Sequence, residues 1–190
     1  METKKEIRKR IRALRAAIPS EEKQRYSNRI IDRLLIHPLF LSAKEIYCYV
    51  SAAEEVSTIQ LIEKCWKMGK TVAVPKVIVD NVMEFYYINN FDELEAGYCG
   101  ILEPVLPSVS NKNTMAGGKD VLVVMPGVAF DRKCGRIGYG KGFYDAYLNR
   151  HPDYRRIALA FSAQLVDNIL TDEQDVRPEI VMTEKGSYTC

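Results

Sequence analysis

The residues best suited to chemistry lie between Asp131 and Asp145, in the sequence DRKCGRIGYGKGFYD. Glycines stand at positions 135, 138, 140 and 142, and Arg136 and Lys141 are placed among them. Glycine lets backbone N–H groups approach a phosphate without obstruction, and cationic side chains add charge-assisted hydrogen bonds to the phosphate oxygens. Because an apolar strand is expected before this segment and a helix after it, the pattern predicts a phosphate site at a helix N-terminus.

The letters from Gly135 to Lys141 match the GxxxxGK of a P-loop, but the match fails at the last position. Gly142 stands where a P-loop has the serine or threonine hydroxyl that holds Mg²⁺. A metal would therefore need another ligand, and Asp145, three residues into the expected helix, is the nearest carboxylate. The alternative is structural: the glycines would form only a tight turn, and Asp145 would only complement the helix dipole.

The segments that must position these residues alternate between two periodicities. Ile7, Ile11, Leu14 and Ile18 form one helical stripe that ends at Pro19, and a second helix follows up to His37-Pro38. We expect further helices at Ser57–Met68 and Gly142–Arg150. Strands are expected at five segments rich in branched and aromatic residues: Glu45–Ser51, Thr71–Val77, Val82–Ile88, Asp120–Met125 and Arg156–Phe161. This alternation predicts one α/β domain over residues 1–190, with a largely parallel sheet in a three-layer α/β/α arrangement. The segment Pro104–Lys119 is expected to be a long loop.

The composition narrows the classes of partner. Lys and Arg number 27 against 25 Asp and Glu, and the net charge of +2 does not favour a nucleic-acid binder. No apolar run approaches the roughly 20 residues that cross a bilayer, and the first residues lack the apolar core of a signal peptide. The five cysteines are scattered and form no CxxC pair, so they indicate neither a disulfide framework nor a zinc site. We expect a cytoplasmic protein without a membrane, nucleic-acid or obligatory protein partner.

The run MPGVAFDRKCGRIGYGKGFYDAYL, from Met125 to Leu148, resembles the signature of the 5-formyltetrahydrofolate cyclo-ligase family. Other segments that resemble landmarks of this family follow in the expected order along essentially the whole chain: Lys4–Arg15, Tyr49–Thr58, Gly100–Pro104, Ile157–Gln164 and Glu173–Asp175. The resemblance implies a fold like that of the sugar-phosphate isomerase and CoA-transferase group. It also implies that ATP and 5-formyltetrahydrofolate become 5,10-methenyltetrahydrofolate, ADP and phosphate, with Mg²⁺ required.

The resemblance assigns roles to individual residues. Arg136 and Lys141 are the expected catalytic residues, since phosphoryl transfer depends on positioning and on cations. The metal ligands would be Asp145 and Asp175, and the second is less secure because Pro178 stands where many relatives have an acidic residue. The expected ATP contacts are Lys4, Lys5, Arg8, Arg136, Gly138, Tyr139, Gly140, Lys141, Gly142, Phe143 and Tyr144. The expected substrate contacts are Val50, Glu55, Tyr139, Gly140, Lys141, Gly142 and Phe143, and Glu55 would accept hydrogen bonds from N–H groups of the pterin.

Simpler explanations exist for several of these residues. Lys4 and Arg8 lie four apart and would also fit a solvated basic helix face. Tyr144 would fit ordinary core packing, as would Met83 and Phe85, which alternate on an expected strand and would otherwise line the pterin or benzoyl pocket. Glu55 alone would be an unremarkable exposed carboxylate.

Two other functions remain open at this stage. The incomplete P-loop also fits a small-molecule kinase or another nucleotide-binding hydrolase, although Gly142 weighs against it. The basic first helix fits a nucleic-acid-binding adaptor, although the total charge is nearly neutral. Both histidines, His37 and His151, abut prolines at expected element ends, so neither is predicted to be a general base.

Overall fold

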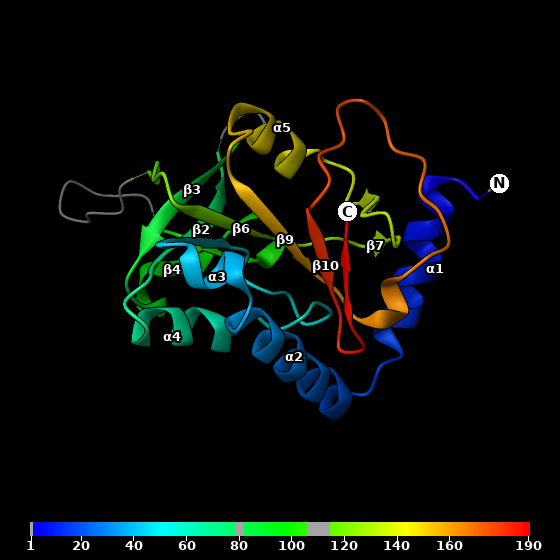
Figure 1. The fold of residues 1–190 in the computed structure, drawn as a ribbon, viewed down its shortest axis with the longest axis horizontal. Helices are drawn as coiled ribbons and strands as arrows, with labels where there is room; N and C mark the ends of the chain where they lie inside the picture. Colours follow the sequence, from blue (N-terminus) through cyan, green and yellow to red (C-terminus); the bar gives the residue numbers. More distant parts are fainter. Residues whose placement is uncertain (1, 79–81, 106–114) are drawn as a thin grey trace.

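The computed structural model describes residues 2–78, 82–105 and 115–190, and within these ranges a seven-stranded sheet has the order β11-β10-β9-β6-β1-β2-β3 (Figure 1). The strands from β10 to β2 are parallel, and β3 and β11 pair antiparallel at the two edges. This confirms the predicted α/β class with a largely parallel sheet. The strand bounds are β1 Glu45–Cys48, β2 Thr71–Val77, β3 Met83–Ile88, β6 Val121–Met125, β9 Arg155–Leu159, β10 Ile180–Met182 and β11 Ser187–Thr189.

Helices cover both faces of this sheet, which confirms the predicted three layers (Figure 1). Neighbouring residues of a strand point to opposite faces. Ile46 of β1 therefore lies in the core under α2, α3 and α4, whereas Tyr47 lies in the core under α5, and both side chains are fully buried. The helix bounds are α2 Ser20–Leu35, α3 Pro38–Ser42, α4 Ile59–Lys67 and α5 Phe143–Arg150. None of the helices in the described part of the chain is long and apolar enough to span a membrane.

The first helix, α1 (Lys4–Ala16), packs away from the main cores and against the segment that leads into the glycines. A capping box between Thr3 and Glu6 begins the helix. Ile7 and Ile11 are buried against a hairpin formed by β7 (Ala129–Phe130) and β8 (Arg136–Ile137). The predicted apolar stripe is wrong at its third member: Leu14 is 46% exposed, and the next residue, Arg15, is buried instead. The buried stripe thus continues in steps of four residues.

The structure also differs from the prediction after β1. The expected strand Glu45–Ser51 ends at Cys48, because the side chain of Thr58 bonds to the following backbone. Its hydroxyl donates to the carbonyl of Tyr49 and accepts from the N–H of Ser51, which takes these groups out of strand pairing. Part of the expected loop Pro104–Lys119, residues 106–114, lies outside the described residues. Elements too short for a periodic signal were not predicted: α3, β4 (Leu94–Ala96), β5 (Leu102–Pro104), β7, β8, β10, β11 and the 3-10 turns at Phe91–Glu93, Tyr98–Gly100 and Ser162–Gln164.

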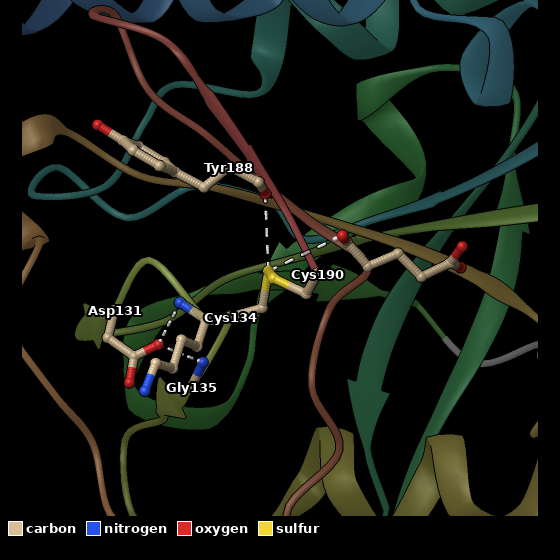
Figure 2. The surroundings of a disulfide bond; sticks show 7 residues. Asp131, Cys134, Gly135, Tyr188 and Cys190 are labelled. Atoms are coloured by element: carbon tan, nitrogen blue, oxygen red, sulfur yellow. Dashed lines mark hydrogen bonds between the residues drawn. A yellow bond between two sulfur atoms is a disulfide. The ribbon is translucent and has the colours of Figure 1, made fainter.

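The structure contains one disulfide, between Cys134 and Cys190, which the cysteine pattern did not predict. The Cα atoms of the two residues are 6.0 Å apart, which suits the geometry of the bond. Figure 2 shows that it joins the end of β11 to the turn that precedes Gly135. Sequence spacing missed this pair because its partners are 56 residues apart and meet only when β11 pairs with β10. Cys48, Cys65 and Cys99 are free thiols, so the chain has no framework of several bridges among its described cysteines.

We predict that Cys190→Ser lowers the free energy of unfolding by about 2–4 kcal/mol under non-reducing conditions, because a crosslink over this separation restricts the unfolded chain. Chemical denaturation of the two proteins measures the difference. Adding a thiol reductant should bring the wild type down to the variant, and Cys99→Ser, which removes a free exposed thiol, should behave as the wild type. A wild type that is insensitive to the reductant would contradict the prediction.

Candidate functional site

A cavity of about 650 Å³ opens at the carboxyl ends of the central strands. Val50 follows β1, Pro126 follows β6 and Val77 ends β2, and all three line the cavity. Ligands of open α/β sheets bind at this edge, where loops leave the parallel strands. The glycine-rich segment reaches the same cavity from the hairpin β7–β8, so the predicted phosphate site and the predicted substrate strand meet here.

A buried carboxylate shapes the start of the glycine-rich segment. Asp131 is 2% exposed, and one of its oxygens accepts hydrogen bonds from the N–H groups of Lys133 and Gly135, each at 2.8 Å (Figure 2). Its other oxygen accepts from the N–H of Ile169 at 2.8 Å. Further along, Gly142 has φ 70° and precedes α5 directly, a backbone conformation that residues with side chains rarely adopt. This role of Asp131 was not predicted from the sequence.

Three cations on one face of α1 line the cavity: Lys4, Arg8 and Arg12. The Nε of Arg8 donates to the carbonyl of Gly138 at 2.8 Å and so ties α1 to the glycine-rich segment. Arg12 was not predicted, although its spacing of four from Arg8 was a signal for it. Lys5 is exposed and does not line the cavity, because the next residue along a helix points about 100° away.

Lys4 is held by two carboxylates rather than standing free. Its Nζ lies 2.7 Å from Asp172 and 2.8 Å from Asp175. Burial would lower the pKa of Lys4, but the two carboxylates outweigh burial and raise it. Burial would likewise raise the pKa of Asp175, but Lys4 and the backbone N–H of Asp172 hold it below its usual value. Both groups are therefore charged at neutral pH, and a bound phosphate would have to share Lys4 with them.

The two predicted catalytic cations differ in their surroundings. Arg136 is buried, and its Nη2 lies 2.6 Å from the carboxylate of Asp145, which also accepts from the backbone N–H of Val176 at 3.0 Å. The Nε of Arg136 has no partner among the described residues. Lys141 is exposed and makes no hydrogen bond or ion pair with the described part of the chain, yet it lines the cavity. Of these two side chains, Lys141 is the one whose charge is not already neutralised.

A chain of hydrogen bonds runs along the wall of the cavity from α1 to the turn after β1. Nη1 of Arg15 donates to the hydroxyl of Tyr139 at 3.1 Å, and this hydroxyl donates to Glu55. The other oxygen of Glu55 accepts from the N–H of Ala52 at 2.9 Å. Burial, and then the negative charge of Glu55, raises the pKa of Tyr139, so its hydroxyl stays protonated and can donate. Arg15 was not predicted, because the apolar stripe was expected to continue through its neighbour Leu14, which is exposed.

Apolar and aromatic side chains form the rest of the wall. Phe143 lines the cavity and meets the ring of Tyr98 edge to face, at 5.8 Å between centroids. Tyr144 also lines it, and its buried hydroxyl has no partner within the described residues. Met83 and Phe85 were expected either to line the substrate pocket or to pack in the core. Met83 lines the cavity, whereas Phe85 is fully buried and stacks on Tyr47 in the core.

The residues predicted to hold a metal come together, but they do not form a metal centre by themselves. The described residues contain no group of three or more His, Cys, Asp or Glu side chains that could hold an ion. Asp145 and Asp175 both line the cavity, and their protein contacts use Oδ1 of the first and Oδ2 of the second. Mg²⁺ commonly takes one or two carboxylates and completes its shell with substrate phosphates and water. The donor set therefore fits an ion that arrives with a phosphate ligand.

Comparison with known proteins agrees with the resemblance of the motifs. The model of the 5-formyltetrahydrofolate cyclo-ligase family matches residues 1–184. The chain is 31% identical to the 5-formyltetrahydrofolate cyclo-ligase of Mus musculus over 188 residues, which cover 94% of this chain and 90% of that protein. It is 26% identical to the enzyme of the same name from Escherichia coli K12, over 91% of this chain and 96% of that protein. Its structure is similar to the 5,10-methenyltetrahydrofolate synthetase of Aquifex aeolicus, with a TM-score of 0.84 and 30% identity, over 98% of this chain and 92% of that chain.

We predict that Tyr139→Phe destabilises the protein by about 1–3 kcal/mol, since the loss of one hydroxyl leaves the buried Arg15 and the partly exposed Glu55 without their shared partner. Chemical denaturation of the purified variant measures the change. Tyr98→Phe is the matched control, because the hydroxyl of Tyr98 makes no hydrogen bond with the described residues, and it should change stability by less than about 0.5 kcal/mol. Equal stability of the two variants would show that the hydrogen-bond chain contributes nothing.

Proposed function

Since the chain belongs to the 5-formyltetrahydrofolate cyclo-ligase family, we propose that it converts 5-formyltetrahydrofolate into 5,10-methenyltetrahydrofolate, consuming ATP and releasing ADP and phosphate. One observation carries most of the support. A single cavity is lined by the glycine-rich segment with its cations, and by Val50, Glu55 and an apolar wall that match the substrate side of the resemblance. A site for phosphates and a site for a flat ring thus share one space, as a reaction between two substrates requires.

The chemistry explains why ATP is needed. A formamide oxygen is a poor leaving group, so the γ-phosphoryl group is transferred to it and ADP departs. The nitrogen N10 of the folate then attacks the activated formyl carbon and closes the five-membered ring. N10 loses its proton, the bond between carbon and the phosphorylated oxygen breaks, and phosphate leaves. These reaction steps require the protein to orient the two substrates and to place positive charge at the phosphates. They do not require a covalent intermediate on a side chain.

The residues of the site fit these tasks. Arg8 and Lys141 would contact the phosphates of ATP, and the backbone N–H groups from Gly138 to Gly142 would surround them. Arg136, held by Asp145, would supply a fixed positive charge at the transferred group. Phe143 and Tyr144 offer ring faces and edges to the two substrates. Lys5, which does not reach the cavity, has no part in this proposal.

Asp145 and Asp175 would hold Mg²⁺ together with the phosphates. When bound, the ion would neutralise phosphate charge that Lys4, Arg8 and Lys141 do not neutralise themselves. The carboxylate of Asp145 also keeps Arg136 in place, and that of Asp175 keeps Lys4 near the glycine-rich segment. We place the enzyme in the cytoplasm and expect small molecules to be its partners, since the near-neutral charge does not favour nucleic acid.

We predict that the purified protein forms the methenyl product only when 5-formyltetrahydrofolate, ATP and Mg²⁺ are all present. The absorbance of the methenyl product and a coupled assay for ADP should show equal amounts of both, because each ring closure consumes one γ-phosphoryl group. A protein that transfers phosphate to a stable product would instead be a small-molecule kinase. Formation of the methenyl product at an unchanged rate without ATP would also contradict the proposal.

We predict that Asp175→Asn raises the Mg²⁺ concentration needed for half-maximal turnover about tenfold or more, because a neutral amide is a poorer ligand for a hard cation. Titration of Mg²⁺ at fixed ATP measures this, and ATP binding in the presence of a chelator should not weaken. Asp172→Asn is the control, since Asp172 also contacts Lys4 but is 79% exposed and does not line the cavity. An equal Mg²⁺ requirement in both variants would remove Asp175 from the metal site. Asp145 is less suited to this test, because its loss would leave the buried Arg136 without its anion.

A further inference from the structure

Glu103, on β5, is a buried carboxylate that the roles described so far do not use. It is 6% exposed and lines the cavity. Its only hydrogen bond with the described residues is accepted by Oε1 from the N–H of Val77, at 3.3 Å, and it forms no ion pair there. Removing a carboxylate from water is costly unless donors replace the water. Oε2 of Glu103 accepts no hydrogen bond from the described residues and is not one of the fully buried unpaired atoms, so it is open to the cavity as an acceptor without a donor.

The local structure is built around this side chain. The hairpin of β4 and β5 pairs Glu103 with Glu95, and Nζ of Lys76 fixes the next residue by donating to the carbonyl of Pro104 at 2.6 Å. A Cβ atom on Gly97 would overlap the carboxylate of Glu103. The backbone of Gly97 has φ −111° and ψ −138°, and the absence of a side chain at this position leaves space for the carboxylate. The hairpin thus makes room for the carboxylate at the cavity wall.

The other carboxylates that line the cavity already have strong donors. Glu55 accepts from Tyr139 and Ala52, Asp145 from Arg136 and Val176, and Asp175 from Lys4 and Asp172. In the described part of the chain, Glu103 is the lining carboxylate without a cationic or hydroxyl donor. Glu55 was predicted to accept from the pterin, but each of its oxygens is already engaged, so Glu103 is the more available acceptor.

The surroundings of Glu103 define the chemistry of the group that it would bind. Pro75, Val77, Met83 and Ile101 line the same cavity and bring apolar surface from β2, β3 and the segment before β5. The predicted phosphate contacts come instead from α1 and the glycine-rich segment. An apolar wall with one carboxylate fits a flat heterocycle that presents N–H donors along one edge, since the ring can cover the wall while its donors reach the two oxygens.

We infer that Glu103 recognises the aminopyrimidine edge of the pterin ring, through the amino group at position 2 and the adjacent N3–H. This inference rests on the proposed function and adds a specificity-determining residue to it. The pterin edge presents two neighbouring donors, which match the two oxygens of a carboxylate. The corresponding edge of adenine places an amino donor beside a ring nitrogen that accepts, so it would repel one carboxylate oxygen. The choice between the two heterocycles follows from this donor pattern.

Glu103→Gln tests the inference, because it keeps the size of the side chain and replaces one acceptor oxygen by an N–H donor. The KM for 5-formyltetrahydrofolate should rise about 10- to 100-fold, and the KM for ATP should stay within about twofold. Glu95→Gln is the matched control, since Glu95 lies opposite Glu103 in the hairpin, is 58% exposed at its side chain and does not line the cavity. It should leave both KM values unchanged. Glu103→Asp, which draws the carboxylate back by one methylene, provides a second variant should the first fail to fold, and it should also raise the folate KM.

A folate analogue with a methyl group in place of the 2-amino group separates recognition from general damage to the pocket. The wild type should bind the natural substrate at least tenfold more tightly than the analogue in a direct binding measurement, and Glu103→Gln should largely lose this preference. A loss of ATP affinity with intact folate affinity would assign Glu103 to adenine and overturn the inference, as would a preserved preference for the amino group. Wild-type protein that makes no methenyl product would defeat the proposed function itself, whereas active wild type with an unaffected Glu103→Gln variant would defeat only this inference.

Discussion

The ion pair between Asp145 and Arg136 holds the walls of the cavity together. Asp145 lies in the first turn of α5, Arg136 lies in β8, and the glycine-rich segment connects the two, so the pair closes that segment into a loop. The same carboxylate accepts from the N–H of Val176, which anchors the stretch that carries Asp175, and Asp175 in turn contacts Lys4 of α1. Three parts of the chain that are distant in sequence are thereby placed around one space. The buried Arg136 makes this arrangement sensitive, because an unpaired guanidinium there would be strongly unfavourable.

This pairing also sets the electrostatics of the site. Lys4 and Arg136 face the cavity but are matched by carboxylates, whereas Lys141 contacts no anion of the described residues. A phosphate that enters would meet Lys141, Arg8 and Arg12 as cations without an ion pair among the described residues, and it would compete with Asp175 for Lys4. Since a carboxylate carries one negative charge and a terminal phosphate group close to two, the exchange favours the phosphate. The carboxylate oxygens released by that exchange are the ligands a divalent cation prefers.

The parts of the fold that could be predicted are those with a long, periodic signal. Thr71–Val77 was located to the residue because it is a buried run between turn signals, and the helices followed from apolar residues at helical spacing. The three-residue strands β10 and β11 could not be found, because such segments have no measurable period and are defined by their neighbours. The site divides in the same way. The chemistry of the glycine-rich segment can be predicted from its residue types and their spacing. The roles of Arg15 and Glu103, and the disulfide between Cys134 and Cys190, depend on contacts with residues distant in the sequence.

The difference between Glu55 and Glu103 shows what a sequence motif leaves open. Glu55 stands in a segment that resembles a substrate-binding strand and turn, and the structure places it at the cavity with both oxygens engaged. Glu103 lies in the short segment GILEP, whose sequence does not show whether this carboxylate binds a ligand or lies on the surface. What separates them is the packing of the hairpin over Gly97, which places the mostly buried carboxylate of Glu103 beside an apolar cavity wall and leaves one of its oxygens without a protein donor. A buried acceptor that receives too few hydrogen bonds from the protein is available to a ligand. Comparing the acceptors at the cavity with their protein donors therefore identifies Glu103.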